Sequence, residues 1–193
     1  RKSATSKWYI CFSCETLSKP LPKSQDTVGI DVGLTSFATF SNKEKISNPR
    51  YFKQGEKNLF KVQRKLSKAK KGSHERKKRR KAVAKVHNRI SNRRNNFTHQ
   101  ESRKIVNKYG IICIEDLSVN KMVHNNCLSK SIYDAAWSQF IKYLSYKAEN
   151  AGRTLVRVNP AYTSQTCSSC GHREVKKLSD RVHNCSCCGI SID

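Results

Sequence analysis

Four cysteines near the end of the sequence constrain its fold more than any other feature. They form two Cys-x2-Cys pairs, Cys167 with Cys170 and Cys185 with Cys188, separated by fourteen residues, and a glycine follows each pair. Four thiolates at such spacing bind Zn²⁺ in a closed tetrahedral shell, with each sulfur about 2.3 Å from the ion. The pattern therefore predicts a zinc ribbon with a structural metal, in preference to redox pairs or unrelated thiols.

Three other side chains near these pairs are candidate ligands. Cys187 lies inside the second pair, but the glycine after Cys188 favours Cys185 and Cys188. His172 and His183 are expected at the surface, because four thiolates already complete the shell.

The chain is strongly basic, which indicates the class of its partner. Its 193 residues include 39 Lys and Arg against 14 Asp and Glu, a formal net charge of +25. Nucleic acid is the common polyanion that neutralises such a charge. No apolar run is long enough to cross a bilayer, and the first residues lack the apolar stretch of a signal peptide, so no membrane partner is expected.

Much of this charge falls in one segment. Residues 61–94 contain 16 Lys and Arg and one acidic residue. A solvated helix face, the alternative interpretation, normally mixes both signs, so the segment predicts a nucleic-acid-binding surface. The candidate contacts are Lys68, Lys70, Lys71, Arg76, Lys77, Lys78, Arg79, Arg80, Lys81, Lys85, Arg89, Arg93 and Arg94.

The order of apolar patterns predicts a mixed α/β sheet domain. Short apolar runs predict strands over 7–15, 27–33, 34–40, 45–52, 110–117 and 154–158. The first would bury Cys11 and Cys14, and the nearly continuous apolar run 110–117 is typical of a strand buried on both faces. Apolar residues spaced three and four apart predict a helical hairpin over 56–108 that turns at 71–73, and a helix over 131–150.

Two acidic residues follow apolar positions in expected central strands. Asp31 lies between two glycines in the strand 27–33, and Glu115 lies near the end of 110–117. Two such carboxylates from neighbouring strands predict a divalent-cation site for phosphodiester hydrolysis, with Mg²⁺ or Mn²⁺ as the ion. The alternative is that Asp31 caps a turn and Glu115 pairs with a basic side chain. Asp116 points to the opposite strand face and cannot share the role of Glu115.

Several motifs occur together in one order. They are Gly29-Ile30-Asp31-Val32-Gly33, Ile114-Glu115-Asp116-Leu117, the segment 137–152, and Thr163-Ser164-Gln165-Thr166-Cys167-Ser168-Ser169-Cys170-Gly171 after Asn159-Pro160. With these motifs the chain resembles the OrfB/TnpB proteins of bacterial insertion sequences, relatives of type V CRISPR effector nucleases. The resemblance implies an RNase H-like (RuvC-type) nuclease core with the zinc ribbon inserted before its last acidic residue. It also implies a transposon-encoded protein that cleaves DNA with a guide RNA, in the cytoplasm at the nucleoid.

The resemblance assigns the acids and divides the chain. Asp31 matches the first catalytic carboxylate and Glu115 the second. Family members continue after the second knuckle with Asp-Arg-Asp, and the later Asp is expected to bind metal, whereas this sequence reaches only the earlier one, Asp193. Residues 1–24 match the end of a preceding β-domain and a linker, 25–160 the nuclease core, and 161–193 the ribbon.

We therefore expect the chain to be a fragment or degenerate copy that lacks one metal-binding acid and the closing helix. Two rival hypotheses follow. In one, the chain is an inactive module that binds DNA or RNA through the ribbon and the basic hairpin. In the other, it is a zinc-ribbon protein of the translation apparatus, with no use for Asp31 and Glu115.

Overall fold

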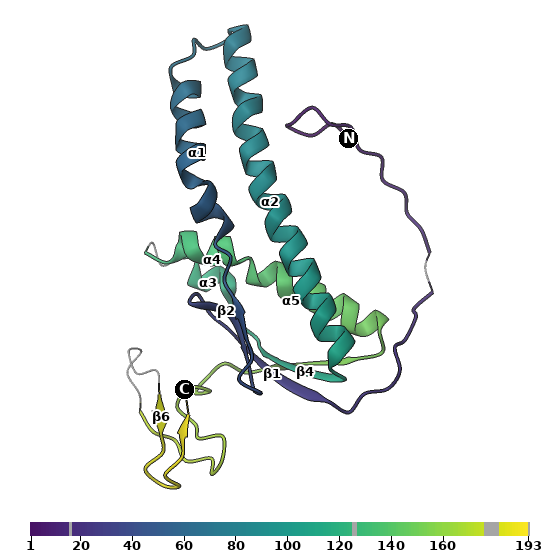
Figure 1. The fold of residues 1–193 in the computed structure, drawn as a ribbon, viewed down its shortest axis with the longest axis vertical. Coiled ribbons are helices and arrows are strands. Elements are labelled where there is room, and N and C mark those ends of the chain that lie inside the picture. The colour runs from purple at the N-terminus through teal and green to yellow at the C-terminus, as the bar shows by residue number, and fades with distance from the viewer. Residues whose placement is uncertain (16, 125–126, 176–181, 193) are drawn as a thin grey trace. The chain divides into compact units, whose positions relative to one another are not determined.

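The structure is a computed structural model that describes residues 1–15, 17–124, 127–175 and 182–192 (Figure 1). Its elements are β1 (Thr27–Val32), β2 (Ser36–Phe40), β3 (Lys45–Ser47), α1 (Tyr51–Ser67), α2 (His74–Lys108), β4 (Ile111–Glu115), α3 (Val119–Met122), α4 (Ser129–Ala135), α5 (Trp137–Asn150), β5 (Thr154–Val158), β6 (His183–Asn184) and β7 (Ser191–Ile192). They fall into two compact units. The first comprises Arg1–Ile114 with Ser118–Val156, and the second comprises Glu115–Leu117 with Arg157–Asp193.

The expected mixed sheet is present, with strand order β3-β2-β1-β4-β5. β1 and β2 are antiparallel, and Ile30 lies opposite Phe40. β1 and β4 are parallel, with Thr27 opposite Ile111 and Ile30 opposite Ile114. The sheet therefore combines a local hairpin with a crossover connection, and the helical hairpin forms that crossover.

The core lies against one face of the sheet. Ile112 and Ile114 of β4 are buried, but Ile111 is 37% exposed. The prediction of burial on both faces was wrong, because alternate side chains leave a strand on opposite faces and helices cover one of them. On the covered face, Phe37 of β2 packs edge-on against Phe97 of α2 and Phe140 of α5, with ring centroids 4.9 Å apart in both pairs.

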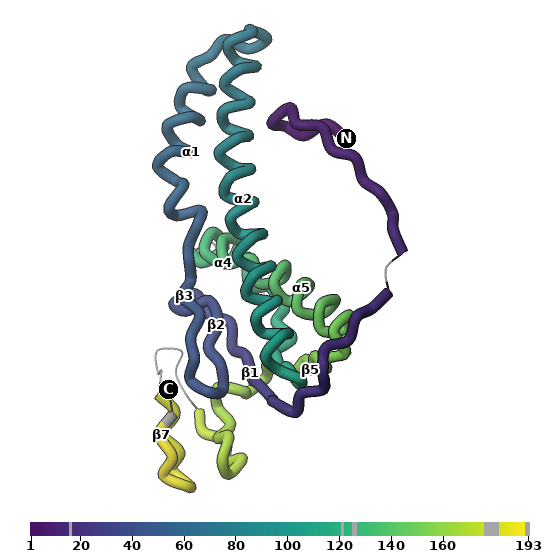
Figure 2. The backbone as a smooth tube through the Cα atoms, turned by 45° about the vertical axis from the view of Figure 1, so that its right-hand side comes forward, coloured from purple at the N-terminus to yellow at the C-terminus, as the bar shows by residue number. Residues whose placement is uncertain are grey.

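The predicted helical hairpin is formed by α1 and α2, which lie side by side in both views (Figures 1 and 2). The turn between them includes Gly72 with φ 82°, and the Ser73 hydroxyl caps α2 by accepting from Arg76 N at 3.1 Å. A Cβ added at Gly55 would lie 2.8 Å from Cδ1 of Ile90, so glycine permits the close approach of the two helices. The predicted strand over 45–52 is shorter than expected, because α1 begins at Tyr51.

The segment expected as one helix over 131–150 consists of two. Ala136 adopts a left-handed conformation with φ 57° and separates α4 from α5. α5 packs along α2 and brings Lys147, which is 4% exposed, into the interface. Its Nζ donates to the His99 carbonyl at 2.7 Å and to Ser102 Oγ at 2.8 Å, and burial lowers its pKa. These hydrogen bonds offset the cost of burying the Lys147 amine. The apolar pattern of α5 did not predict that Lys147 would be buried.

The prediction of a strand over 7–15 was wrong. The described part of this segment forms an isolated bridge between Lys2 and Trp8, and Cys11 and Cys14 are exposed rather than buried. A strand needs a partner for its backbone groups, and β-forming residues alone do not supply one. Among the described residues, none of the helices has the length and hydropathy needed to cross a membrane.

Candidate metal centre and nuclease site

The four predicted cysteines meet in one cluster. The Sγ atoms of Cys167, Cys170, Cys185 and Cys188 all lie within 4.8 Å of one another. The Cys167–Cys188 distance is 3.6 Å and the Cys170–Cys185 distance is 3.5 Å. A tetrahedral ion with Zn–S bonds of about 2.3 Å places its sulfurs about 3.8 Å apart. The cluster therefore has the dimensions of a four-thiolate metal site.

The two Cys-x2-Cys segments fold alike. Gly171 N donates to the Cys167 carbonyl at 3.0 Å, and Gly189 N donates to the Cys185 carbonyl at 2.9 Å. Both glycines have positive φ, 74° and 70°, which only glycine adopts without strain. The glycine after each pair thus closes a tight turn that directs both sulfurs of the pair to the same point.

Backbone N–H groups favour the deprotonated form of the Cys167 thiol. The amides of Cys170 and then Ser169 lower the pKa of the Cys167 thiol to about 6, against a smaller opposing effect of burial. A thiol must lose its proton to bind a metal, and Cys167 does so more readily than an ordinary thiol. At Cys170 the backbone N–H of His172 is outweighed by burial and the neighbouring thiols, which raise its pKa to about 12, and the pKa of Cys188 is also raised. Cys187 is exposed and lies outside the cluster, as do His172 and His183. Cys188, and not Cys187, thus belongs to the cluster of four thiols.

The two predicted acidic residues follow a matched pair in neighbouring strands. Asp31 is the residue after Ile30 in β1, and Glu115 is the residue after Ile114 in β4. Asp31 is exposed and Glu115 is half-buried. Asp193, the third candidate, lies outside the described residues.

Glu115 has a hydrogen-bond partner that sequence reasoning missed. Thr163 Oγ1 lies 2.6 Å from Glu115 Oε1 and 3.1 Å from the Pro160 carbonyl. A hydroxyl has one proton, and the shorter contact assigns it to the carboxylate. Glu115 thus accepts a hydrogen bond from a hydroxyl, whereas Asp116 pairs with Arg157 at 3.3 Å. The one feature of the sequence that could have pointed to Thr163 as a functional residue is the Thr-Ser-Gln motif before the first cysteine pair.

The thirteen basic residues predicted to bind nucleic acid differ in whether their side chains already have a partner within the protein. Four of them already have protein partners. Arg76 donates to the Leu66 and Ala69 carbonyls, Arg94 donates to the Tyr133 carbonyl, Arg79 pairs with Glu75, and Arg93 stacks on the Tyr51 ring. The other nine are exposed side chains on the α1–α2 hairpin.

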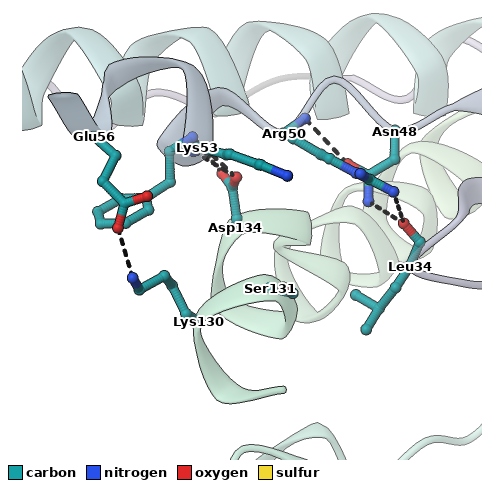
Figure 3. A pocket seen from close by; sticks show the side chains of 9 residues that line it. Leu34, Asn48, Arg50, Lys53, Glu56, Lys130, Ser131 and Asp134 are labelled. Carbon is teal, nitrogen blue, oxygen red and sulfur yellow. Dashed lines mark hydrogen bonds and ion pairs between the residues drawn. The ribbon is translucent and has the colours of Figure 1, made fainter. Parts of the chain in front are cut away.

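A polar pocket of about 330 Å³ lies where α1 begins (Figure 3). The Asp134 carboxylate accepts from the backbone N–H of Phe52 at 2.8 and 2.9 Å, so it caps α1. Glu56 pairs with Lys130 at 2.5 Å, and Asn48 Nδ2 donates to the Leu34 carbonyl at 3.0 Å. These polar groups satisfy one another, so the pocket joins α1 to α4 and to the loop after β1.

Sheet, hairpin and cysteine cluster together define a class: mixed α/β proteins in which a basic helical hairpin connects two parallel strands and a four-cysteine knuckle pair follows. Residues 9–126 match the family model OrfB_IS605, described as "Probable transposase", and residues 137–193 match the Cas12f1-like TNB domain. Because the first match covers more than half of the sequence, the chain belongs to the OrfB family of transposases. The resemblance identified from the motifs is thereby confirmed.

Curated relatives and solved structures agree with this membership. The chain is 38% identical over 188 residues to a "Putative RNA-guided DNA endonuclease" of Streptomyces pristinaespiralis, covering 96% of the chain and 47% of that protein. It is 31% identical over 196 residues to "Putative RNA-guided DNA endonuclease InsQ" of Escherichia coli (strain K12), covering 93% and 49%. The chain thus spans about half the length of these relatives.

The fold also resembles that of a protein in a solved complex. The structure titled "Cryo-EM structure of the Cas12f1-sgRNA-target DNA complex" superposes with a TM-score of 0.60 at 21% identity, over 91% of this chain and 48% of that one. At this identity the match shows a shared fold.

Proposed function

We propose that this chain contains the nuclease core and zinc ribbon of a transposon-encoded, RNA-guided DNA endonuclease. The observation that carries the proposal is the parallel pairing of β1 with β4, in which Ile30 lies opposite Ile114. Asp31 and Glu115 are the next residues of these strands, as the carboxylates of an RNase H-like site must be. Family membership and the names of the relatives support the same activity.

In this proposal Asp31 and Glu115 hold Mg²⁺ or Mn²⁺, because hard divalent ions prefer carboxylate oxygens. Two such ions, when bound, stabilise the charge that develops on the attacking and leaving oxygens of a phosphodiester. Asp31 and Glu115 would each supply carboxylate oxygens as ligands to these ions. Asp193 matches an acid of the same motif, and the protein at the full length of its relatives would supply the remaining ligand.

The role of Thr163 gives a first test. We expect Thr163→Val, in a protein extended to the length of its relatives, to reduce Mg²⁺-dependent cleavage by about 10- to 100-fold. The reason is that valine lacks the hydroxyl that orients the Glu115 carboxylate. Raising the Mg²⁺ concentration should restore part of the rate, and Thr163→Ser should retain it. Ser164→Ala, which changes the next side chain in sequence, an exposed one, is the control. A rate unchanged in Thr163→Val would remove Thr163 from the site.

The same proposal places DNA and a guide RNA on the basic hairpin. Charge supplies affinity without reading sequence, because phosphates are the same in every site. In a triple variant, Lys77, Lys78 and Lys81 are all replaced with Gln. We expect this variant to lose the same factor of affinity for DNA duplexes of different sequence. The slope of log K against log salt should fall by about 2 to 3, since each phosphate contact contributes about 0.9.

A charge-matched variant controls for net charge. Lys19, Lys23 and Lys142 are exposed and lie outside the hairpin, so their combined change to Gln should leave the slope nearly unchanged. Equal slopes for the two triple variants would show that the hairpin charge is merely solvated.

A further inference from the structure

One face of α1 combines five basic side chains with an exposed aromatic ring. We call it the α1 stripe and define it by Lys57, Phe60, Lys61, Arg64, Lys65 and Lys68, which line a surface hollow of about 370 Å³. At 100° per residue these positions fall within an arc of roughly 140° on the helix. Leu59, which is buried, lies on the other side of α1. Four of the five basic residues, all except Lys68, are not among the thirteen candidate contacts chosen from the sequence.

Phe60 is the unusual member of this stripe. It is 57% exposed, whereas the other apolar side chains of α1, all of them described, are half-buried or buried: Tyr51, Phe52, Leu59, Val62 and Leu66. A single exposed apolar residue is ordinary on a protein surface. Here the other residues that line the hollow are all cations, and Glu56, one turn before Phe60, pairs with Lys130. That combination fits a ligand with both negative charge and flat apolar faces.

Nucleic acid with unpaired bases has these two properties. Aromatic rings flanked by Lys and Arg bind it by stacking on a base while the cations contact the neighbouring phosphates. A duplex offers the phosphates but keeps its bases stacked inside. The stripe extends over eleven steps of helix, roughly 17 Å, long enough to follow several nucleotides.

We propose that the α1 stripe binds a structured RNA at an unpaired nucleotide, with Phe60 stacking on its base. RNA is the occupant we commit to, because folded RNA presents unpaired bases in loops and bulges beside dense phosphate. This inference rests on the proposed function, which supplies the guide RNA, and adds to it the kind of RNA element and the residue that recognises it.

The test measures the affinity of the chain for three labelled oligonucleotides with the same total number of nucleotides: an RNA hairpin with an unpaired loop, a fully paired RNA duplex, and an unstructured single-stranded DNA that includes the loop sequence. Phe60→Ala is expected to weaken binding of the RNA hairpin by roughly tenfold. Binding of the duplex should change little, and the salt dependence of both should persist because no charge is lost. Alanine is a better helix former than phenylalanine, so α1 should not unfold.

Three further variants make the result specific. Phe60→Trp should retain the affinity for the RNA hairpin, and Phe60→Leu, which keeps apolar contact without a stacking ring, should not. Tyr133→Ala removes another exposed aromatic ring, on α4, and should have no effect.

The proposal is overturned if Phe60→Ala weakens hairpin and duplex equally, if Phe60→Leu binds like the native chain, or if the loss is confined to single-stranded DNA. Binding to phosphatidylserine vesicles that depends on Phe60, with no such dependence for RNA, would assign the stripe to a membrane and also overturn it. Failure of the proposed function looks different: an extended protein that never cleaves DNA contradicts the nuclease assignment and leaves the effect of Phe60 on RNA binding intact.

Discussion

Replacing Asp31 or Glu115 with alanine is expected to abolish Mg²⁺-dependent DNA cleavage while nucleic-acid binding persists. The two carboxylates are proposed as metal ligands, whereas affinity comes from cations on the hairpin, so the substitutions separate chemistry from binding. The assay needs a protein extended to the length of its relatives, with guide RNA and a matched DNA target.

Asp116→Ala is the matched control for these substitutions. It removes a carboxylate next to Glu115 in sequence, but one that pairs with Arg157. Its cleavage rate should stay close to that of the native protein. Cleavage that survives Asp31→Ala would show that the active site lies elsewhere.

Cys167→Ser is expected to release the metal from the cysteine cluster and unfold the segment around it. The chain should bind one zinc ion. Cys167 and Cys185 are the buried apolar residues among those of the ribbon that the structure describes, so we expect the metal to supply much of its folding energy. Metal analysis of reduced protein gives the stoichiometry, and hydrogen exchange of residues 157–192 reports the folding. The sheet and the helical hairpin should keep their protection.

Cys187→Ser provides the comparison for this loss. It removes a neighbouring thiol that lies outside the cluster, so zinc content and protection should both remain. Zinc absent from the native reduced chain, or retained in Cys167→Ser, would contradict the assignment of the ligands.

Local signals in the sequence were sufficient for much of this architecture. The spacing of the cysteines and the glycines after them identified the ligand cluster, because each turn is built from consecutive residues. The helical hairpin was also predictable, since its apolar period and the turn at Gly72 are local. Asp31 and Glu115 could be singled out because acids are rare in apolar strands.

Features that depend on tertiary contacts were not predictable. The segment 7–15 has the composition of a strand but no partner strand in the described residues. Ala136 interrupts a continuous helical pattern, and only the positions of α4 and α5 reveal the break. Thr163 lies 48 residues from Glu115 in sequence, so their hydrogen bond had no local pattern.

The hydrogen bond from Thr163 to Glu115 has a thermodynamic consequence for the two proposed metal sites. Thr163 is only four residues before Cys167, and the Thr166 amide and hydroxyl between them bond back to the Tyr162 carbonyl. If zinc orders this segment, it also orders the donor that orients Glu115, and by linkage a cation on Glu115 must favour zinc binding by the same factor. Zinc on the cysteine cluster would then act as an allosteric effector of the carboxylate site. Removing zinc should weaken the affinity for Mg²⁺ under conditions in which the chain still binds nucleic acid.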